Sequence, residues 1–134
     1  MDMEAPATVL VIEDSPVVQH LLRATLTPLG VDLLFASDGE SGLDVARTQL
    51  PDLITLDIGL PGIDGWEVLT QLRSSPSTSQ IGVVVVTAHA QESTRIAAAN
   101  LGAERFVTKP FRPQDLRSAV SELLDSLAAP VASG

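Results

Sequence analysis

Residues 9–30 read VLVIEDSPVVQHLLRATLTPLG, and they join a short β-branched apolar run to a longer amphipathic segment. The opening VLVI has the composition of a buried strand. Ser15 followed by Pro16 suits a helix N-cap and the first helical position, and apolar residues then recur at helical spacing as far as Leu29. Gly30 can end such a helix in a left-handed turn. The stretch therefore predicts one strand followed by one helix.

The same strand–helix unit recurs four more times along the chain. The further apolar runs lie at residues 31–35, 53–56, 81–86 and 106–107, and helix-like segments follow them at 40–49, 66–73, 92–101 and 113–127. Strands that alternate with helices cannot pair as hairpins, so we expect a parallel sheet with right-handed crossovers and helices on both faces. The run 81–86 is nearly all apolar, as expected of a strand covered on both faces. The pattern predicts a doubly wound α/β fold with a five-stranded parallel sheet.

Size and composition restrict the class of protein. The 134 residues make about one domain when domains contain roughly 100–200 residues. With 45% hydrophobic and 19% charged residues the chain can bury a core, and the absence of cysteine excludes disulfides. A net charge of −9 disfavours direct binding of nucleic acid, and no apolar run approaches the roughly 20 residues that span a bilayer. We therefore expect a globular cytoplasmic protein without membrane insertion.

Polar side chains follow four of the five predicted strands. Glu13 and Asp14 follow the first strand, Asp57 the third, Thr87 the fourth and Lys109 the fifth. The carboxyl ends of parallel strands meet at one edge of the sheet, and doubly wound proteins bind ligands beyond that edge. We therefore expect three carboxylates, a hydroxyl and an ammonium group to lie close together.

This set of groups points to a cation and a phosphoryl group. Neighbouring carboxylates repel each other unless a cation lies between them, and oxygen ligands without histidine or cysteine favour Mg²⁺ over zinc. Magnesium in proteins commonly accompanies phosphoryl groups. Lys109 and the hydroxyl of Thr87 could bind phosphoryl oxygens while the Asp57 carboxylate attacks phosphorus.

Four segments of the chain resemble the signature segments of one family, the receiver domains of bacterial two-component response regulators. They are VLVIEDSP at 9–16, LDIGLPGIDGWEVL at 56–69, VVVTAH at 84–89 and FVTKPF at 106–111. The order and the spacing of all four agree with that family. The resemblance implies a CheY-like, flavodoxin-like fold and a role in phosphorelay signal transduction.

The resemblance also implies a division of the chain. It extends over residues 8–128, which we expect to form the receiver domain. Residues 1–7 would then be an N-terminal extension and residues 129–134 a flexible C-terminal tail. Both a stand-alone receiver and a receiver taken from a longer chain, such as a hybrid kinase, fit this sequence.

By resemblance, Asp57 is the phosphoacceptor and receives its phosphoryl group from a histidine kinase or a histidine phosphotransfer protein. Asp14 and Asp57 would hold Mg²⁺ directly, Glu13 would hold it through water, and the carbonyl of Gly59 would supply a further ligand. Such a chain is a phosphoacceptor signalling protein that takes part in its own phosphorylation and dephosphorylation, and it is not an ordinary enzyme.

The family also implies a switch. Thr87 would bind the phosphoryl group, Lys109 would pair with it, and a shift of Thr87 would reorient Phe106 on the fifth strand. The face made by the fourth helix, fifth strand and fifth helix would then change for a downstream protein effector. We further hypothesise that His89 influences dephosphorylation, and Lys109 followed by Pro110 resembles the cis Lys–Pro bond of the family.

Two rival functions are weaker on the same residues. A Mg²⁺-dependent phosphohydrolase with an aspartyl-phosphate intermediate usually carries its nucleophile at the first strand together with a cap insertion. Here the first strand ends in Glu13-Asp14-Ser15 and no insertion is present. A flavin or nucleotide binder needs a phosphate-binding loop after the first strand, where this chain has acids, and only 3% of its residues are aromatic.

Overall fold

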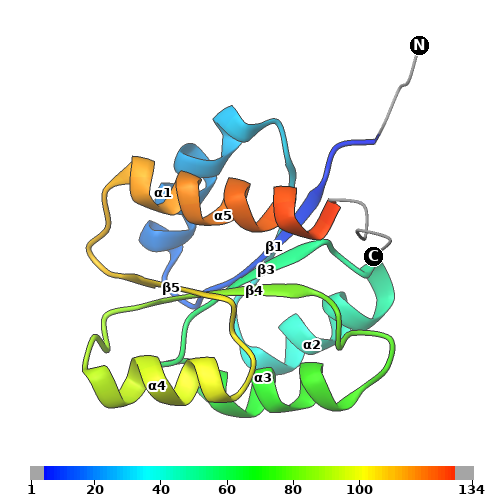
Figure 1. Cartoon of the computed structure of the whole chain (residues 1–134), viewed down its shortest axis with the longest axis vertical. Helices are drawn as coiled ribbons and strands as arrows, with labels where there is room; N and C mark the ends of the chain where they lie inside the picture. Colours follow the sequence, from blue (N-terminus) through cyan, green and yellow to red (C-terminus); the bar gives the residue numbers. More distant parts are fainter. Residues whose placement is uncertain (1–4, 129–134) are drawn as a thin grey trace, which may run out of the picture.

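Five parallel strands form a single sheet in the computed structural model, which describes residues 5–128. The strands are β1 (Thr8–Ile12), β2 (Asp32–Ala36), β3 (Leu53–Leu56), β4 (Gly82–Thr87) and β5 (Arg105–Thr108). Their order in the sheet is β2-β1-β3-β4-β5 (Figure 1). The sheet is therefore wound in one direction from β1 to β2 and in the other from β3 to β5. This confirms the predicted doubly wound α/β fold.

Helices cover both faces of this sheet (Figure 1). They are α1 (Pro16–Leu26), α2 (Gly39–Gln49), α3 (Gly65–Ser74), α4 (Glu92–Asn100) and α5 (Pro113–Ala128). The helices α1 and α5 pack against one face, and α2, α3 and α4 lie on the other. No helix within residues 5–128 is both long and apolar enough to cross a bilayer.

The first helix begins where the sequence predicted and ends earlier. The hydroxyl of Ser15 accepts a hydrogen bond from the backbone N–H of Val18 at 3.3 Å, which caps the N-terminus of α1. The α-helix ends at Leu26 and a 3₁₀ turn, η1 (Thr27–Leu29), follows it. Pro28 has no N–H to continue the α-helical hydrogen bonds, which explains the early end. Gly30 then adopts the expected left-handed conformation, with φ of 72°.

Two apolar layers, one on each face of the sheet, form the core. Alternate residues of each strand point to opposite faces. On β3, Ile54 and Leu56 pack on the side of α2 and α3, while Leu53 packs toward α1 and α5. All three are fully buried. The sheet is therefore held between two apolar layers.

Strand register decides which residues meet at the carboxyl edge of the sheet. Ile12 of β1 lies opposite Leu56 of β3, so the residues that follow these two strands lie at the same level. Thr87 of β4 lies opposite Thr108 of β5. The predicted 1–7 extension falls partly, and the 129–134 tail wholly, outside the described residues.

Candidate functional site

The acidic side chains that follow β1 and β3 come together at the carboxyl edge of the sheet. Glu13 is only 2% exposed and Asp57 only 9%, whereas Asp14 is exposed. One carboxylate oxygen of each residue lies within 4.8 Å of the other two. The proximity expected from the sequence is therefore present for all three acids.

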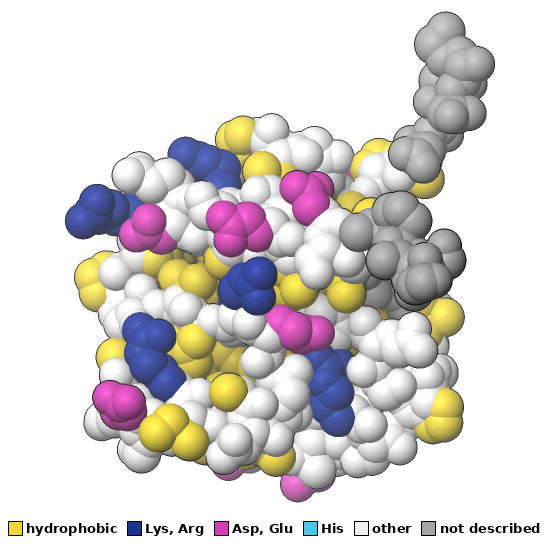
Figure 2. All heavy atoms as spheres, viewed as in Figure 1, with side chains coloured by type: hydrophobic (Ala, Val, Ile, Leu, Met, Phe, Trp, Pro, Cys, Tyr) yellow, Lys and Arg dark blue, Asp and Glu magenta, His cyan; other side chains and the backbone are white. Residues whose placement is uncertain are grey.

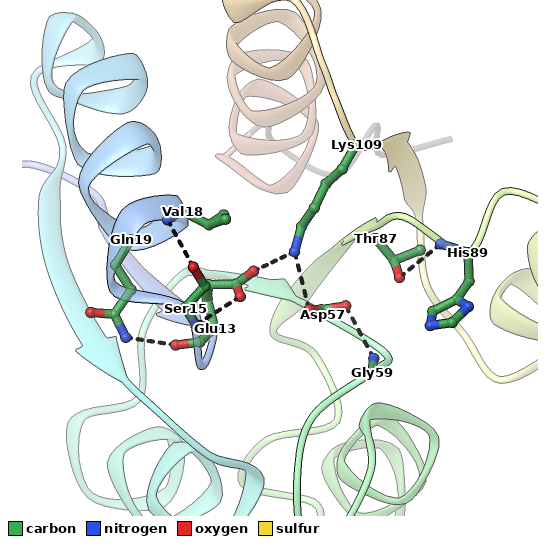
Figure 3. A network of polar contacts seen from close by, with 9 residues as sticks. All are labelled: Glu13, Ser15, Val18, Gln19, Asp57, Gly59, Thr87, His89 and Lys109. Carbon is green, nitrogen blue, oxygen red and sulfur yellow. Dashed lines mark hydrogen bonds and ion pairs between the residues drawn. The ribbon is translucent and has the colours of Figure 1, made fainter.

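Both carboxylate oxygens of Glu13 accept hydrogen bonds from the protein (Figure 3). The Oε1 atom lies 2.6 Å from Nζ of Lys109, and Oε2 accepts from the backbone N–H of Ser15 at 3.1 Å. Burial raises the pKa of the Glu13 carboxyl, and this effect outweighs the opposite effect of the hydrogen bonds from Lys109 and Ser15. Glu13 is thus a buried acid whose position is set by two donors.

Asp57 has the same kind of arrangement and shares one of the donors. Its Oδ2 lies 3.1 Å from Nζ of Lys109, and its Oδ1 accepts from the backbone N–H of Gly59 at 3.0 Å (Figure 3). Burial alone lowers the pKa of Lys109, but the hydrogen bonds to Glu13 and Asp57 outweigh it and raise that pKa above its ordinary value. Lys109 therefore stays charged between two buried carboxylates.

Local structure next to β5 positions this lysine. Lys109 follows the last residue of β5, and its backbone N–H donates to the carbonyl oxygen of Thr87 at 2.9 Å. The Lys109–Pro110 peptide bond is cis, in agreement with the family resemblance. The side chain thus starts beside β4 and reaches back across the edge to Glu13 and Asp57 (Figure 3).

Thr87 is the last residue of β4 and is fully buried. Its hydroxyl oxygen accepts from the backbone N–H of His89 at 3.3 Å. Figure 3 shows Thr87 and Asp57 at the ends of strands that are neighbours in the sheet. The structure thus brings the predicted hydroxyl to the same edge as the carboxylates.

Gly59 and His89 lie close together beside Asp57 (Figure 3). A Cβ atom placed on Gly59 would lie 3.2 Å from Nε2 of His89 and 3.9 Å from Oδ1 of Asp57. The absence of a side chain at Gly59 therefore leaves room for the imidazole next to the Asp57 loop.

Phe106 lies apart from this group of polar side chains. It is half-buried on β5, opposite Val85 of β4, and it packs against the apolar layer shared by α2, α3 and α4. It is two residues from Thr108, which pairs with Thr87. Phe106 is therefore connected to the site through the pairing of β4 with β5 and not through the hydrogen bonds of the carboxylates.

Two further residues shape the site and were missed by the sequence reasoning. Nε2 of Gln19 donates to the carbonyl oxygen of Glu13 at 2.6 Å and thereby holds the acidic turn after β1 (Figure 3). Gly65 packs so closely that an added Cβ would lie 2.5 Å from the carbonyl oxygen of Asp57. The position of Gln19 one helical turn beyond Ser15 could have indicated that its side chain reaches the turn after β1. No pattern in the sequence marked the close packing of Gly65.

The donor set fits a hard divalent cation. Three carboxylates and one ammonium group leave a formal charge of −2 at the site if all are ionised. Their oxygen donors are of the type that Mg²⁺ prefers. Both oxygens of Glu13 and both oxygens of Asp57 accept hydrogen bonds from protein donors, whereas Asp14 is exposed. Asp14 is therefore the most accessible of the three acids to an ion.

Comparison with known proteins gives a consistent result. The family described as the response regulator receiver domain matches residues 9–121. The chain is 38% identical over 124 residues to the alkaline phosphatase synthesis transcriptional regulatory protein PhoP of Bacillus subtilis. The match covers 91% of this chain and 51% of that protein. The chain therefore spans about half the length of this curated relative.

Solved structures of similar shape cover nearly the whole chain. A putative response regulator from Chloroflexus aurantiacus has a TM-score of 0.85 and 33% identity over 90% of this chain and 98% of its own. The receiver domain of sensor histidine kinase PA1611 from Pseudomonas aeruginosa has a TM-score of 0.80 and 26% identity over 93% of this chain and 100% of its own. That structure was determined with a magnesium ion coordinated in its active-site cleft. These similarities favour a receiver domain over the phosphohydrolase and over the flavin or nucleotide binder.

Proposed function

The chain belongs to the response regulator receiver domain family, and we propose that Asp57 is its phosphoacceptor. The phosphoryl donor would be the phosphorylated imidazole of a histidine kinase or of a histidine phosphotransfer protein. One observation carries this proposal: the Asp57 carboxylate lies at the carboxyl edge of the sheet between Lys109 and the N–H of Gly59. Both donors hold the carboxylate in one orientation, which favours attack along one line.

Each residue of the site would have a separate role in the transfer of the phosphoryl group. An oxygen of Asp57 forms the new bond to phosphorus while the bond from phosphorus to the imidazole nitrogen breaks and its electron pair returns to the ring. Lys109 offsets negative charge on the transferred group, and the hydroxyl of Thr87 donates a hydrogen bond to it. Glu13 keeps Lys109 at the edge of the sheet through its 2.6 Å ion pair.

Magnesium is the cofactor that we propose for this site. Asp14, Asp57 and the carbonyl oxygen of Gly59 would be direct ligands, and Glu13 would act through water. When bound, the ion would neutralise negative charge on the phosphoryl oxygens. The support is the formal charge of the cluster and the hard character of its oxygen donors.

A phosphoryl group on Asp57 would act on the face formed by α4, β5 and α5. It adds about −1.5 to −2 charge and strong hydrogen-bond acceptors beside Thr87. We propose that Thr87 moves toward it and that Phe106 reorients as a consequence, because the two residues lie on neighbouring strands. The changed face would bind a downstream protein effector.

Basic residues are concentrated in the part of the chain that forms this face. Five of the eight basic residues lie between residues 95 and 117, although the chain carries a net charge of −9. Figure 2 shows Lys and Arg side chains together with Asp and Glu side chains on this side of the molecule, among patches of hydrophobic surface. Arginine is enriched in protein–protein interfaces, so this surface of apolar patches and charged residues is suited to binding another protein.

Phosphorylation of the purified chain tests the proposal. Incubation with Mg²⁺ and a small acyl phosphate should add one phosphoryl group, measured by intact-protein mass spectrometry. Asp57→Asn should abolish the addition, whereas Asp44→Asn, which changes an exposed acid on α2, should leave it unchanged. Addition that persists in Asp57→Asn contradicts the proposal. Continuous release of phosphate over many turnovers would instead support the phosphohydrolase.

The remaining parts of the proposal concern the chain as a whole. We propose residues 8–128 as the receiver domain, acting in the cytoplasm as a phosphoacceptor signalling protein and not as an ordinary enzyme. The family match over residues 9–121 supports the domain boundaries.

A further inference from the structure

The helix α4 is held to the sheet by unusually few buried side chains. Among its residues only Ala98 is buried, whereas α3 buries four. Ile96 points outward and is 52% exposed. The side chain of the N-cap residue Gln91 caps no backbone N–H of the helix and only accepts a 3.4 Å hydrogen bond from the hydroxyl of Thr94. The position of α4 therefore depends strongly on any other contact that it makes with the sheet.

Arg95 of α4 makes such a contact, and it does so with two residues of β5. Its guanidinium carbon lies 4.7 Å from the centre of the Phe106 ring, within the range of a cation–π interaction. Its Nη2 also donates to the hydroxyl of Thr108 at 3.1 Å. Phe106 and Thr108 are two residues apart, so they share one face of the strand. We call these three residues the Arg95 clamp.

The Arg95 clamp adjoins two residues of the proposed phosphorylation site, Thr87 and Lys109. Thr108 pairs with Thr87 across β4 and β5. The residue after Thr108 is Lys109, whose backbone N–H donates to the carbonyl oxygen of Thr87. A displacement of Thr87 would therefore act first on the strand to which Arg95 is attached.

We propose that Arg95 is a positioning residue that holds α4 on β5 and releases it when Asp57 is phosphorylated. The release step rests on the proposed function. Movement of Thr87 and reorientation of Phe106 would take the ring away from the guanidinium and disturb the bond to Thr108. The helix α4 would then keep only Ala98 as a buried anchor, and its exposed Ile96 and freed Arg95 would become available to a partner.

The proposal has a reciprocal consequence. If α4 has two positions, held on β5 and released, phosphorylation can shift the equilibrium between them only because it favours one position over the other. Removing the Arg95 clamp should therefore loosen α4 without phosphorylation, and phosphorylation should then have little further effect on this helix. A residue that only stabilised the fold would leave the effect of phosphorylation unchanged.

Amide hydrogen exchange of the unphosphorylated chain tests the first part. Arg95→Ala should lower the protection of α4 amides by about tenfold, the combined effect of one exposed cation–π contact and one hydrogen bond. Arg95→Lys keeps the charge but loses the planar group, and it should give an intermediate value. The control Arg112→Ala removes another exposed arginine and should change nothing in α4. Unchanged protection in Arg95→Ala overturns the proposal.

A double-mutant cycle tests whether Phe106 is the partner. Phe106→Leu keeps an apolar side chain and removes the aromatic ring. If Arg95 acts through that ring, Arg95→Ala should lower α4 protection much less in the Phe106→Leu chain than in the wild type. Equal effects in both chains overturn the assignment of Phe106 to the clamp.

Phosphorylation with Mg²⁺ and a small acyl phosphate tests the release. Exchange in α4 of the wild type should increase about tenfold on phosphorylation, the same change that removal of the clamp produces. In Arg95→Ala the further increase should be less than about twofold. An equal increase in both proteins overturns the release step. If the wild type accepts no phosphoryl group, the proposed function and the release step both fail, while the exchange of the unphosphorylated variants still decides whether Arg95 holds α4.

Discussion

Replacing Lys109 by methionine removes the cation that two buried carboxylates share. Methionine keeps an unbranched chain of similar length, so the packing of the stem is largely preserved. Nζ of Lys109 makes hydrogen bonds of 2.6 Å to Glu13 and 3.1 Å to Asp57, and both acids are at most 9% exposed. The change therefore leaves two nearby negative charges without their common partner.

The expected loss of stability follows from that burial. Removing one member of a buried ion pair costs about 3–5 kcal/mol because an uncompensated charge is left behind. The Lys109 side chain is 18% exposed, so water reaches the site and the lower end of this range applies, about 3 kcal/mol. A second substitution separates this cause from lost packing. Glu13→Gln removes one unpaired charge from the Lys109→Met chain, and it should stabilise that chain by more than it changes the wild type, where it also removes a partner of Lys109.

Urea unfolding of the four proteins in EDTA at neutral pH measures these values. The fluorescence of Trp66, the only tryptophan in the chain, can follow the transition. Arg112→Met serves as the control, because it removes an exposed cation outside the carboxylate cluster, and it should change the unfolding free energy by less than about 0.5 kcal/mol. If Glu13→Gln changes the unfolding free energies of the wild type and of the Lys109→Met chain equally, the two carboxylates do not depend on Lys109 and the reasoning is refuted.

Further predictions concern the core, the acceptor loop and pH. Thr55 is 1% exposed and its hydroxyl has no hydrogen-bond partner in the described structure, so Thr55→Val should raise the unfolding free energy by about 1 kcal/mol; a loss in urea unfolding would contradict this. Gly65→Ala places a Cβ 2.5 Å from the carbonyl oxygen of Asp57 and should cost about 1–3 kcal/mol and slow phosphorylation by acyl phosphate; wild-type stability and rate would show that the loop adapts freely. His89→Ala should slow the decay of the phosphorylated chain, measured by mass spectrometry over time, and an unchanged decay rate would exclude a role for the imidazole. Because burial raises the pKa of Glu13 above its ordinary 4.5, the folded chain binds this proton more tightly than the unfolded chain does. The stability of the wild type relative to Glu13→Gln should therefore rise as pH falls through the raised pKa toward 4.5, and a fall measured by urea unfolding would refute the assigned direction.

Local patterns were sufficient to predict the fold class and most of the candidate site. The apolar run before Glu13 and the Ser15-Pro16 cap predicted the first strand–helix unit, and the structure confirms both elements. Strand ends were predictable because a change from apolar to acidic residues marks them directly. The site residues followed because parallel strands bring their carboxyl ends to one edge.

Other features depend on contacts between residues far apart in the sequence. Nothing in the residues around Glu13 indicates that both of its oxygens have protein donors, because one donor, Lys109, lies 96 residues away. The close approach of Gly65 to Asp57 depends on how α3 packs against the loop after β3. Only the packed structure reveals such contacts.

The sequence by itself determined that this chain alternates strands and helices and places acids, a hydroxyl and an ammonium group at the strand ends. Periodicity and capping are properties of neighbouring residues, so they can be read locally. The tertiary structure alone decided that Lys109 is shared by Glu13 and Asp57 and that Arg95 of α4 contacts Phe106 and Thr108 of β5. Both depend on strand order and register, which bring distant residues within hydrogen-bond distance and leave α4 with few other contacts.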